Sequence, residues 1–352
     1  MLGVAWPRMR EAIDAPLAGL GVLIAAFTAA YFVSTGASGP LAGRLGTRTL
    51  AVAAAVLAAA GLAAFAATGS WATAIAAALL VGLGGGALDA GINAYVAVTG
   101  GVRAMGLLHA SWALGAALGP ALVGAGEATS TWRASYLAAA LAFAATALLL
   151  VLLPPAVRRA IEPVPSGSGP SASAFVAFAA AMFIVNVGLE SVVGQWAFVD
   201  LSELRGVSGA TAGSGVTLFF AALAAGRVAL GVGGHRVSLQ RELDASVVLT
   251  MAGAIGYWLL PPAVAAIVAL PVLGVGLSVF IPVILVLLPE RIGAGATANA
   301  VGVQFAAGTV GGGGFPPAVG VLMQTLAVPV LGPVVTLLAA ALAALHLEAR
   351  RR

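Results

Sequence analysis

Hydrophobic residues run along this chain in long stretches that are separated by short polar, Pro-rich or Gly-rich breaks. A helix needs about 20 mostly apolar residues to cross the hydrocarbon core of a bilayer, and eleven stretches are about that long. They cover residues 17–38, 49–67, 71–98, 105–126, 133–153, 174–198, 211–231, 243–260, 263–288, 297–320 and 328–346. They lack the alternation of apolar and polar residues that marks the strands of a membrane barrel. The pattern therefore predicts about eleven membrane-spanning helices.

The composition indicates that lipid is the main solvent of these helices. Hydrophobic residues make up 61% of the 352 residues and charged residues only 8%, against roughly 25% charged residues in soluble domains. So few charges could not cover the surface of a soluble protein of this size. We therefore expect an all-α, multi-pass membrane protein in contact with the lipid bilayer. The basic residues are scattered and form no patch, so we expect no nucleic-acid partner.

The arginines predict which helix ends face the cytoplasm. Twelve of the sixteen fall on one side of the predicted bundle: Arg44, Arg48, Arg103, Arg158, Arg159, Arg227, Arg236, Arg241, Arg291, Arg350, Arg351 and Arg352. The other four, Arg8, Arg10, Arg133 and Arg205, fall on the opposite side. Because cytoplasmic loops are enriched in basic residues, we expect the larger group, and with it the C-terminus, in the cytoplasm. The membrane is expected to be the cell (inner or plasma) membrane.

One clear linker divides the chain into two halves. Eleven of the twenty residues from 154 to 173 are Pro, Gly or Ser, a composition that is typical of a flexible connection. We therefore expect an N-terminal helical bundle over residues 1–153, a cytoplasmic linker over 154–173 and a C-terminal six-helix bundle over 174–352.

The two halves show a weak internal repeat. Three sets of residues recur at offsets of 190 to 196: Trp6 with Trp196, Gly39 and Arg44 with Gly231 and Arg236, and Gly115, Pro120 and Gly124 with Gly311, Pro316 and Gly320. Trp196 ends a full stretch, whereas only five residues precede Trp6, so the first half lacks most of one helix. We expect either that the natural chain begins upstream of Met1 or that the protein has lost its first helix.

The segment GPLAGRLGTR, residues 39–48, resembles the motif between the second and third helices of the major facilitator superfamily. Gly39, Arg44, Gly46 and Arg48 fit the pattern, whereas Gly43 stands where an aspartate is usual. The resemblance implies two pseudo-symmetric bundles, a twelve-helix fold whose first helix is here truncated or missing. It also implies that these four matching residues form a conformational latch on the cytoplasmic side.

Further segments resemble the fucose-permease-like branch of proton-coupled sugar carriers. They are LDAGINAY (88–95), similar to its acidic fourth helix, LHASWALGAALGP (108–120), similar to its fifth, and NVGLESVVGQW (186–196) and AAGRVALG (224–231), similar to its seventh and eighth. The resemblance puts Asp89 at the position of the branch's acidic residue. In that fold the first, fourth, seventh and tenth helices line the central cavity.

Two acidic residues inside apolar stretches are candidates for proton coupling. Asp89 is the only charged residue from Trp71 to Val98, and Asn93 follows it by four residues on the same helix face. Glu190 follows Asn186 by the same spacing. Ionisable residues within membrane spans are usually functional. The alternatives are a packing seam in which Asp89 bonds a neighbouring helix and, for Glu190, a solvated gate near the outer end at Trp196.

Six residues are candidates for binding a substrate: Asn93, His109, Trp112, Asn186, Trp196 and Gln304. The amides could hydrogen-bond a polar solute, the imidazole could shuttle protons, and the two indole rings could stack on a sugar. The alternatives are structural hydrogen bonds between helices for His109 and Gln304, and anchoring at the membrane interface for the tryptophans.

The expected function is secondary active transport of a small polar solute, with a sugar favoured, coupled to protons by alternating access. No nucleophile, base and orienting group cluster in the sequence, and three scattered histidines without cysteine predict no metal site. We therefore expect a monomeric carrier that is not an enzyme and has no cofactor, with a small-molecule substrate and protons as partners. The alternatives are a proton-coupled efflux antiporter for drugs or metabolites and a degenerate carrier that does not transport.

Overall fold

The computed structural model describes residues 2–15, 19–129, 132–152, 170–233, 238–326 and 329–351, which form helices and no strands. The helices of the first half are α1 (Leu2–Ala12), α2 (Gly19–Leu45), α3 (Thr47–Ala67), α4 (Trp71–Thr99), α5 (Gly101–Thr129) and α6 (Trp132–Leu152). Those of the second half are α7 (Pro170–Val199), α8 (Gly209–Gly233), α9 (Leu239–Leu259), α10 (Pro262–Val264), α11 (Leu270–Ser278), α12 (Phe280–Ile292), α13 (Ala294–Leu326) and α14 (Leu331–Arg351). Two π-helical turns extend α7 (Asp200–Leu204) and join α10 to α11 (Ala265–Ala269). Each of the eleven hydrophobic stretches therefore corresponds to a helix, with α10–α12 counted as one.

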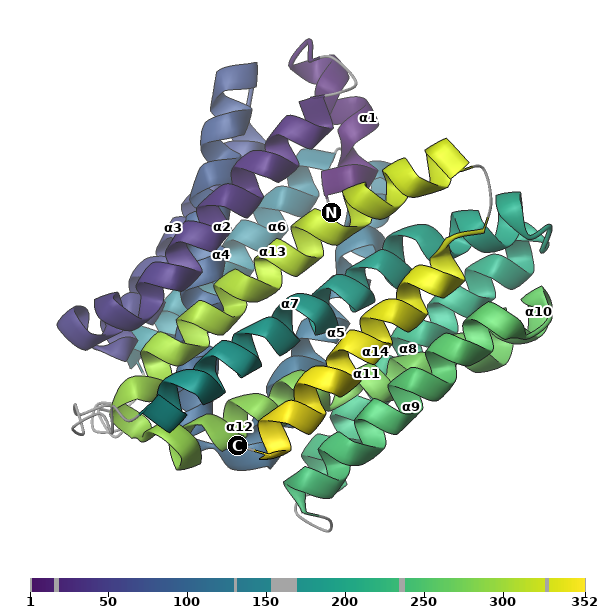
Figure 1. Ribbon diagram of the computed structural model, residues 1–352. Helices are drawn as coiled ribbons and strands as arrows, with labels where there is room; N and C mark the ends of the chain where they lie inside the picture. The colour runs from purple at the N-terminus through teal and green to yellow at the C-terminus, as the bar shows by residue number, and fades with distance from the viewer. Residues whose placement is uncertain are drawn as a thin grey trace. The chain divides into compact units, whose positions relative to one another are not determined.

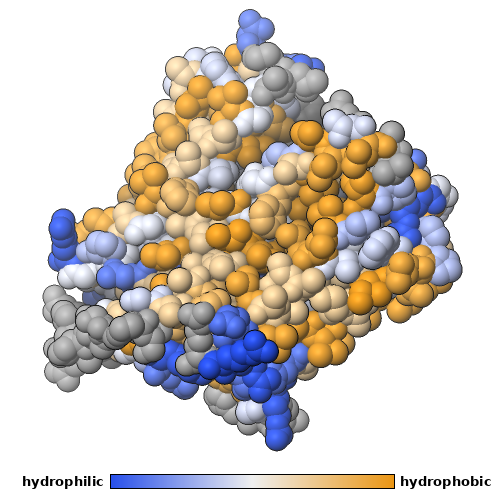
Figure 2. Space-filling model, viewed as in Figure 1, coloured by the Kyte–Doolittle hydropathy of each residue, from blue (hydrophilic) through white to orange (hydrophobic). Residues whose placement is uncertain are grey.

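The helices have the length and the surface of membrane-spanning segments. Within the described part of the chain, eight helices are long and apolar enough to cross a membrane. Large apolar side chains are exposed along them, such as Leu152 (68%) and Val232 (70%). Figure 2 shows hydrophobic residues along the visible lengths of the helices and hydrophilic residues near their ends. This surface fits contact with lipid chains and confirms a multi-pass membrane protein.

The described chain forms two compact units. The first unit comprises Met1–Tyr95, Leu114–Ser166 and Ala294–Ala306, and the second comprises Val96–Ala113, Gly167–Gly293 and Ala307–Arg352. The units follow the two halves of the sequence, with two exceptions: the end of α4 and the beginning of α5 belong to the second unit, and the beginning of α13 belongs to the first. Most of the predicted linker, residues 154–169, lies outside the described residues, and α7 already begins at Pro170.

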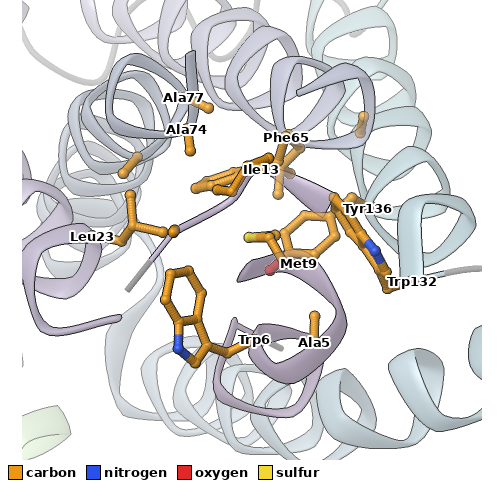
Figure 3. Close-up of a cluster of buried hydrophobic side chains, with 14 residues drawn as sticks. Ala5, Trp6, Met9, Ile13, Leu23, Phe65, Ala74, Ala77, Trp132 and Tyr136 are labelled. Atoms are coloured by element: carbon orange, nitrogen blue, oxygen red, sulfur yellow. The ribbon is translucent and has the colours of Figure 1, made fainter. Parts of the chain in front are cut away.

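In the first unit, α1 fills the end of the bundle at which α2 begins. The buried side chains of Trp6 and Met9 on α1, and of Ile13 just after it, gather with Leu23, Phe65 and Tyr136, which come from α2, α3 and α6 (Figure 3). With 11 residues α1 is about 16 Å long at 1.5 Å per residue, roughly half the thickness of a hydrocarbon core. The helix is therefore too short to span a membrane by itself.

In the second unit, α8, α9, α11 and α14 run side by side (Figure 1). The core of the second unit contains large buried side chains, among them Phe219 and Tyr257 on two of these helices, and Phe183 on α7 and Phe280 on α12. Glycines allow the helices to approach closely, as is usual where lipid-embedded helices pack. A Cβ atom at Gly253, for example, would lie 2.7 Å from the Cα atom of Leu273, so α9 and α11 meet backbone to backbone.

The internal repeat is also present in the packing. A Cβ atom at Gly106 of α5 would lie 3.0 Å from the carbonyl oxygen of Arg227 on α8, within the second unit. A Cβ atom at Gly302 of α13 would lie 2.5 Å from the carbonyl oxygen of Thr35 on α2, within the first unit. Gly302 follows Gly106 by 196 residues and Arg227 follows Thr35 by 192, and both offsets occur in the sequence repeat. The equivalent contacts support a true duplication.

Arginines at opposite helix ends agree with the predicted sidedness. Arg48 lies in the first turn of α3 and donates hydrogen bonds to carbonyl groups at the end of α6. Arg133 donates to carbonyl groups at the other end of α3, those of Ala66 (2.9 Å) and Thr68 (2.8 Å). In the second unit Arg241 lies in the first turn of α9, and Arg205 bonds carbonyl groups at its other end. Arg158, Arg159, Arg236 and Arg352 lie outside the described residues.

Candidate functional site

Asp89 lies on α4 at the centre of a hydrogen-bonded cluster in the first unit. The hydroxyl of Tyr31 on α2 donates to Asp89 Oδ2 at 2.5 Å. The side-chain nitrogen of Asn93 donates to Asp89 Oδ1 at 2.9 Å and to the Asp89 carbonyl oxygen at 3.0 Å. Asp89 as a whole residue is half-buried, whereas Asn93 is only 1% exposed. The predicted pairing of Asp89 with Asn93 therefore forms, and a tyrosine completes it.

Glycines bring α4 close to α2 beside this cluster. A Cβ atom at Gly82 would lie 2.9 Å from the Cβ atom of Ala30, and one at Gly86 would lie 3.1 Å from Thr35 Cγ2. The packing seam expected as an alternative for Asp89 is thus present, and Asp89 does bond the neighbouring helix. The cluster can nevertheless accept a further hydrogen bond, because the buried Asn93 Oδ1 has no hydrogen-bond partner among the described residues.

Tyr31 was not singled out from the sequence, although a signal was present. It is followed at three, four and seven residues by Ser34, Thr35 and Ser38, which places four hydroxyl groups on one face of α2. A stripe of hydroxyl groups in an otherwise apolar stretch marks a face that packs against protein instead of lipid.

Glu190 on α7 forms an ion pair inside the second unit. Its Oε2 atom accepts a hydrogen bond at 3.1 Å from Nη2 of Arg227 on α8, and their side chains are 12% and 2% exposed. Helix α7 does not end at Trp196 but continues to Val199 and then through a π-helical turn to Leu204. Glu190 is therefore farther from the helix end than the sequence indicated, which removes the basis for a solvated gate at that end.

Arg227 is a functional candidate that the sequence analysis missed. The sequence analysis counted it only among the arginines of the cytoplasmic side, within the stretch 211–231, and gave it no role. Its side chain is buried on α8. Without Arg227, eleven of the remaining fifteen arginines still fall on the same side of the predicted bundle. The segment AAGRVALG held the signal, because apolar and small residues flank Arg227 on both sides.

Three other predicted residues lie in the second unit. The ring of Trp112 on α5 covers Arg227, with the guanidinium carbon 5.6 Å from the ring centroid, and the tryptophan is 53% exposed. His109, one turn earlier, is buried and its Nε2 atom has no partner among the described residues. Asn186, one turn before Glu190, is fully buried, and neither of its amide atoms has a partner there.

Trp196 and Gln304 lie apart from these clusters. The indole nitrogen of Trp196 donates to the carbonyl oxygen of Pro316 at 2.7 Å, and the ring occupies the space left by Gly320. This geometry favours a role for Trp196 in packing α7 against α13. Gln304 is fully buried in the first unit, and neither atom of its amide has a partner among the described residues.

The four residues of the expected latch have separate structural roles. Gly46 connects α2 to α3 with φ of 81°, a conformation that favours glycine. Gly39 allows α2 to meet α13, since a Cβ atom there would lie 2.6 Å from the Cα atom of Asn299. Arg48 donates through Nε to the Leu150 carbonyl oxygen at 2.8 Å and through Nη2 to that of Val151. Arg44 is exposed.

Substitution of these two arginines should separate stability from transport. Arg48→Ala removes two hydrogen bonds at the end of α6 and is expected to lower the stability of detergent-purified protein by about 1–3 kcal/mol. Arg44→Ala removes an exposed side chain, so its thermal unfolding midpoint should match that of the wild type, whereas transport should slow if Arg44 acts in the latch. Equal midpoints for the two variants would show that Arg48 does not cap α6 in the folded protein.

Within the described residues, no group of three or more His, Asp or Glu side chains is arranged to hold a metal ion.

Comparisons with known proteins identify the fold. The sequence profile of the Major Facilitator Superfamily matches residues 1–316. The structure is similar to that of FucP, a transporter of this superfamily in the outward conformation, with a TM-score of 0.80 and 17% identity over 99% of this chain and 93% of FucP. It is similar to the proton:xylose symporter XylE, with a TM-score of 0.77 and 14% identity over 98% and 90% of the two chains. The comparison with curated proteins gives no significant match.

A human protein of known structure has the same fold, and its name gives another kind of substrate. The organic anion transporter MFSD10 aligns with a TM-score of 0.73 and 20% identity over 99% of this chain and 88% of MFSD10. At these identities the structural comparisons establish the fold alone. The profile match extends over most of the sequence and agrees with the helical, membrane-spanning architecture, and the chain therefore belongs to the Major Facilitator Superfamily.

Proposed function

We propose that this transporter carries a small polar solute, with a sugar favoured, together with protons by alternating access. The observation that carries the proposal is the carboxyl group of the half-buried residue Asp89 within α4, which Tyr31 and Asn93 hold in place. Ionisable groups at such positions in membrane proteins usually mark ion or substrate pathways. Asp89 is thus the proposed proton site, with Glu190 as a second acidic site in the other unit.

The chemistry of the Asp89 cluster suits reversible protonation. Removal from water disfavours the charged form of a carboxyl group, and the hydrogen bonds from Tyr31 and Asn93 favour it. A change in hydration of the site can therefore shift the balance between the two forms. Asn93, one turn away, can bond either Asp89 or a solute hydroxyl group, which would let one helix face sense both proton and solute.

The buried hydrogen-bonding groups favour a polar solute over an apolar drug. Asn93 Oδ1 and the side-chain amides of Asn186 and Gln304 are buried without partners among the described residues. Unpartnered polar atoms suit a ligand that brings hydroxyl groups, because an apolar ligand would leave them unsatisfied. The structural likeness to the E. coli fucose:proton symporter FucP and to XylE supports a sugar as substrate. This combination is the reason to prefer symport over efflux of apolar compounds.

Tight contacts at Gly39 and Gly106 support alternating access between the two halves of the sequence. Gly39 joins α2 to α13 and Gly106 joins α5 to α8, so each contact pairs a helix of the first half with one of the second. In a mechanism that rocks one half against the other, each contact would separate when its own end of the helices opens. Gly39 lies near Arg44 on α2 and Gly106 lies near Arg103 on α5, and we infer that these arginine-bearing helix ends are cytoplasmic.

The proposal is tested by uptake into proteoliposomes that contain the purified protein. Labelled monosaccharides and their acidic derivatives are presented under an imposed pH difference, acidic outside. At least one is expected to accumulate above its external concentration and to leak out when a protonophore collapses the gradient. Accumulation of none of them would overturn the proposed function.

A further inference from the structure

Arg227 differs from three half-buried arginines, Arg48, Arg133 and Arg205, in how its guanidinium group is bonded. In the described residues Arg48, Arg133 and Arg205 each donate to two backbone carbonyl groups at helix ends. Within the described part of the chain Arg227 donates one hydrogen bond, to Glu190, and its buried Nε and Nη1 atoms have no hydrogen-bond partner. A guanidinium group has five N–H donors and stays charged, so most of its binding capacity is unused by the described protein groups.

Packing alone gives no reason for an arginine at this position. Its equivalent in the first half is Thr35, 192 residues earlier, and both residues present a carbonyl oxygen to a closely packed glycine. Thr35 fills its place with a small, fully buried side chain whose hydroxyl donates to the Phe32 carbonyl oxygen at 2.9 Å. Burial of a charge with incomplete hydrogen bonding is unfavourable. The arginine is therefore better explained by a ligand than by the fold.

The groups around Arg227 define the chemistry of that ligand. The exposed indole ring of Trp112 covers the guanidinium group and can pack against a carbohydrate ring. The buried amide of Asn186 and Nε2 of His109 can exchange hydrogen bonds with hydroxyl groups. Two titratable groups of the described chain interact with the guanidinium: Glu190 from α7, by an ion pair, and His109 from α5, by charge. On the next helix, α11, the hydroxyl of Ser278 lies beside Gly226, the residue before Arg227.

We propose that Arg227 binds the carboxylate of the transported solute, which makes the substrate a hydroxylated organic acid of the sugar-acid class instead of a neutral sugar. Guanidinium–carboxylate pairs combine charge with a matched hydrogen-bond geometry and are among the strong polar contacts in proteins. The carboxylate competes with Glu190 for the guanidinium group, and Trp112 moves aside or packs against the solute ring. The inference rests on the proposed function, since it names the substrate class of the same carrier.

Equilibrium binding to the full-length purified protein in detergent tests this inference. Trp fluorescence and thermal stabilisation are measured with D-glucuronate, D-galacturonate and D-gluconate, and with the neutral parents D-glucose and D-galactose. At least one acid is expected to bind roughly tenfold or more tightly than its neutral parent, because the parent cannot form the charge-assisted hydrogen bond to the guanidinium group. Equal binding of acids and parents, or binding of none of the acids, would overturn the inference.

Variants identify Arg227 as the source of the preference. Arg227→Gln should remove most of the difference between acid and parent, and Arg227→Lys should keep part of it, because the charge remains without the planar fork. Arg205→Gln is the matched control, since Arg205 bonds helix-end carbonyl groups and should affect stability but not the preference. If Arg227→Gln does not fold, Trp112→Ala provides the second test, because this half-exposed residue should alter acid binding without loss of the fold.

The results separate this inference from the proposed function. Proton-driven uptake of a neutral sugar, with acids excluded, would overturn the role of Arg227 in binding a carboxylate and leave the proposed function intact. Tight binding of an acid without any response of uptake to a pH difference would support the role of Arg227 and contradict proton coupling.

Discussion

Asp89→Asn is expected to abolish proton-driven accumulation of the substrate and to leave its binding largely intact. Asparagine has the shape and charge of the protonated aspartic acid, and its side-chain oxygen can still accept the hydrogen bond that Tyr31 donates at 2.5 Å in the wild type. The variant cannot take up or release a proton, so uphill transport should fall to background while downhill exchange continues. Uptake into proteoliposomes with and without a pH difference measures both.

The matched control is Asp200→Asn. Asp200 also accepts a hydrogen bond from a tyrosine, Tyr257, at 2.6 Å, but it is fully buried and lies 3.9 Å from Arg205 in an ion pair. This substitution should lower stability and keep proton-driven accumulation. If Asp89→Asn still concentrates substrate against a gradient, Asp89 is a packing residue and not the coupling site.

Gly39→Ala is expected to cut the transport rate severely, because its new Cβ atom would lie 2.6 Å from the Cα atom of Asn299. A contact that short with a backbone atom forces α2 and α13 apart, so the state in which these helices meet should become rare. Gly36→Ala is the control on the same helix, since its Cβ atom would have nothing within 4 Å. Transport by the control should match that of the wild type.

Separation of the helices can be measured directly, since the chain has no cysteine. Ser38 is buried beside Gly302, and Ser38→Cys provides a single thiol at the contact. Its reaction with a thiol reagent should be faster in the Gly39→Ala background than in the Gly36→Ala background. Equal labelling rates would show that Gly39 does not hold α2 against α13.

Much of the fold could be predicted because membrane helices are recognisable in a sequence by their length and hydrophobicity. All eleven stretches correspond to helices, and the i, i+4 spacing of Asp89 and Asn93 correctly indicated a contact within α4. The superfamily also followed from sequence, through the motif at residues 39–48 and the division into two halves. These features depend on local pattern, which a sequence displays directly.

The partners of the two acidic residues could not be predicted, because they lie on other helices. Tyr31 is 58 residues from Asp89, and Arg227 is 37 residues from Glu190. On a helix of a soluble protein the polar face marks the exposed side and the apolar face the buried side. Here both the side that faces the protein core and the side that faces lipid are apolar, so the sequence does not show how each helix is rotated about its axis. The same limit explains why Arg227 was not singled out as a buried partner of Glu190 and why the helix-end contacts of Arg48 were not foreseen.

Proton movement on addition of substrate tests the central claim most directly. Proteoliposomes are prepared without a pH difference in weakly buffered medium, and the external pH is recorded when a transported solute is added. Symport predicts a transient alkalinisation of the medium, as protons enter with the solute, and predicts no response from the Asp89→Asn variant. Solute entry with no change in external pH, or with acidification, would contradict proton symport.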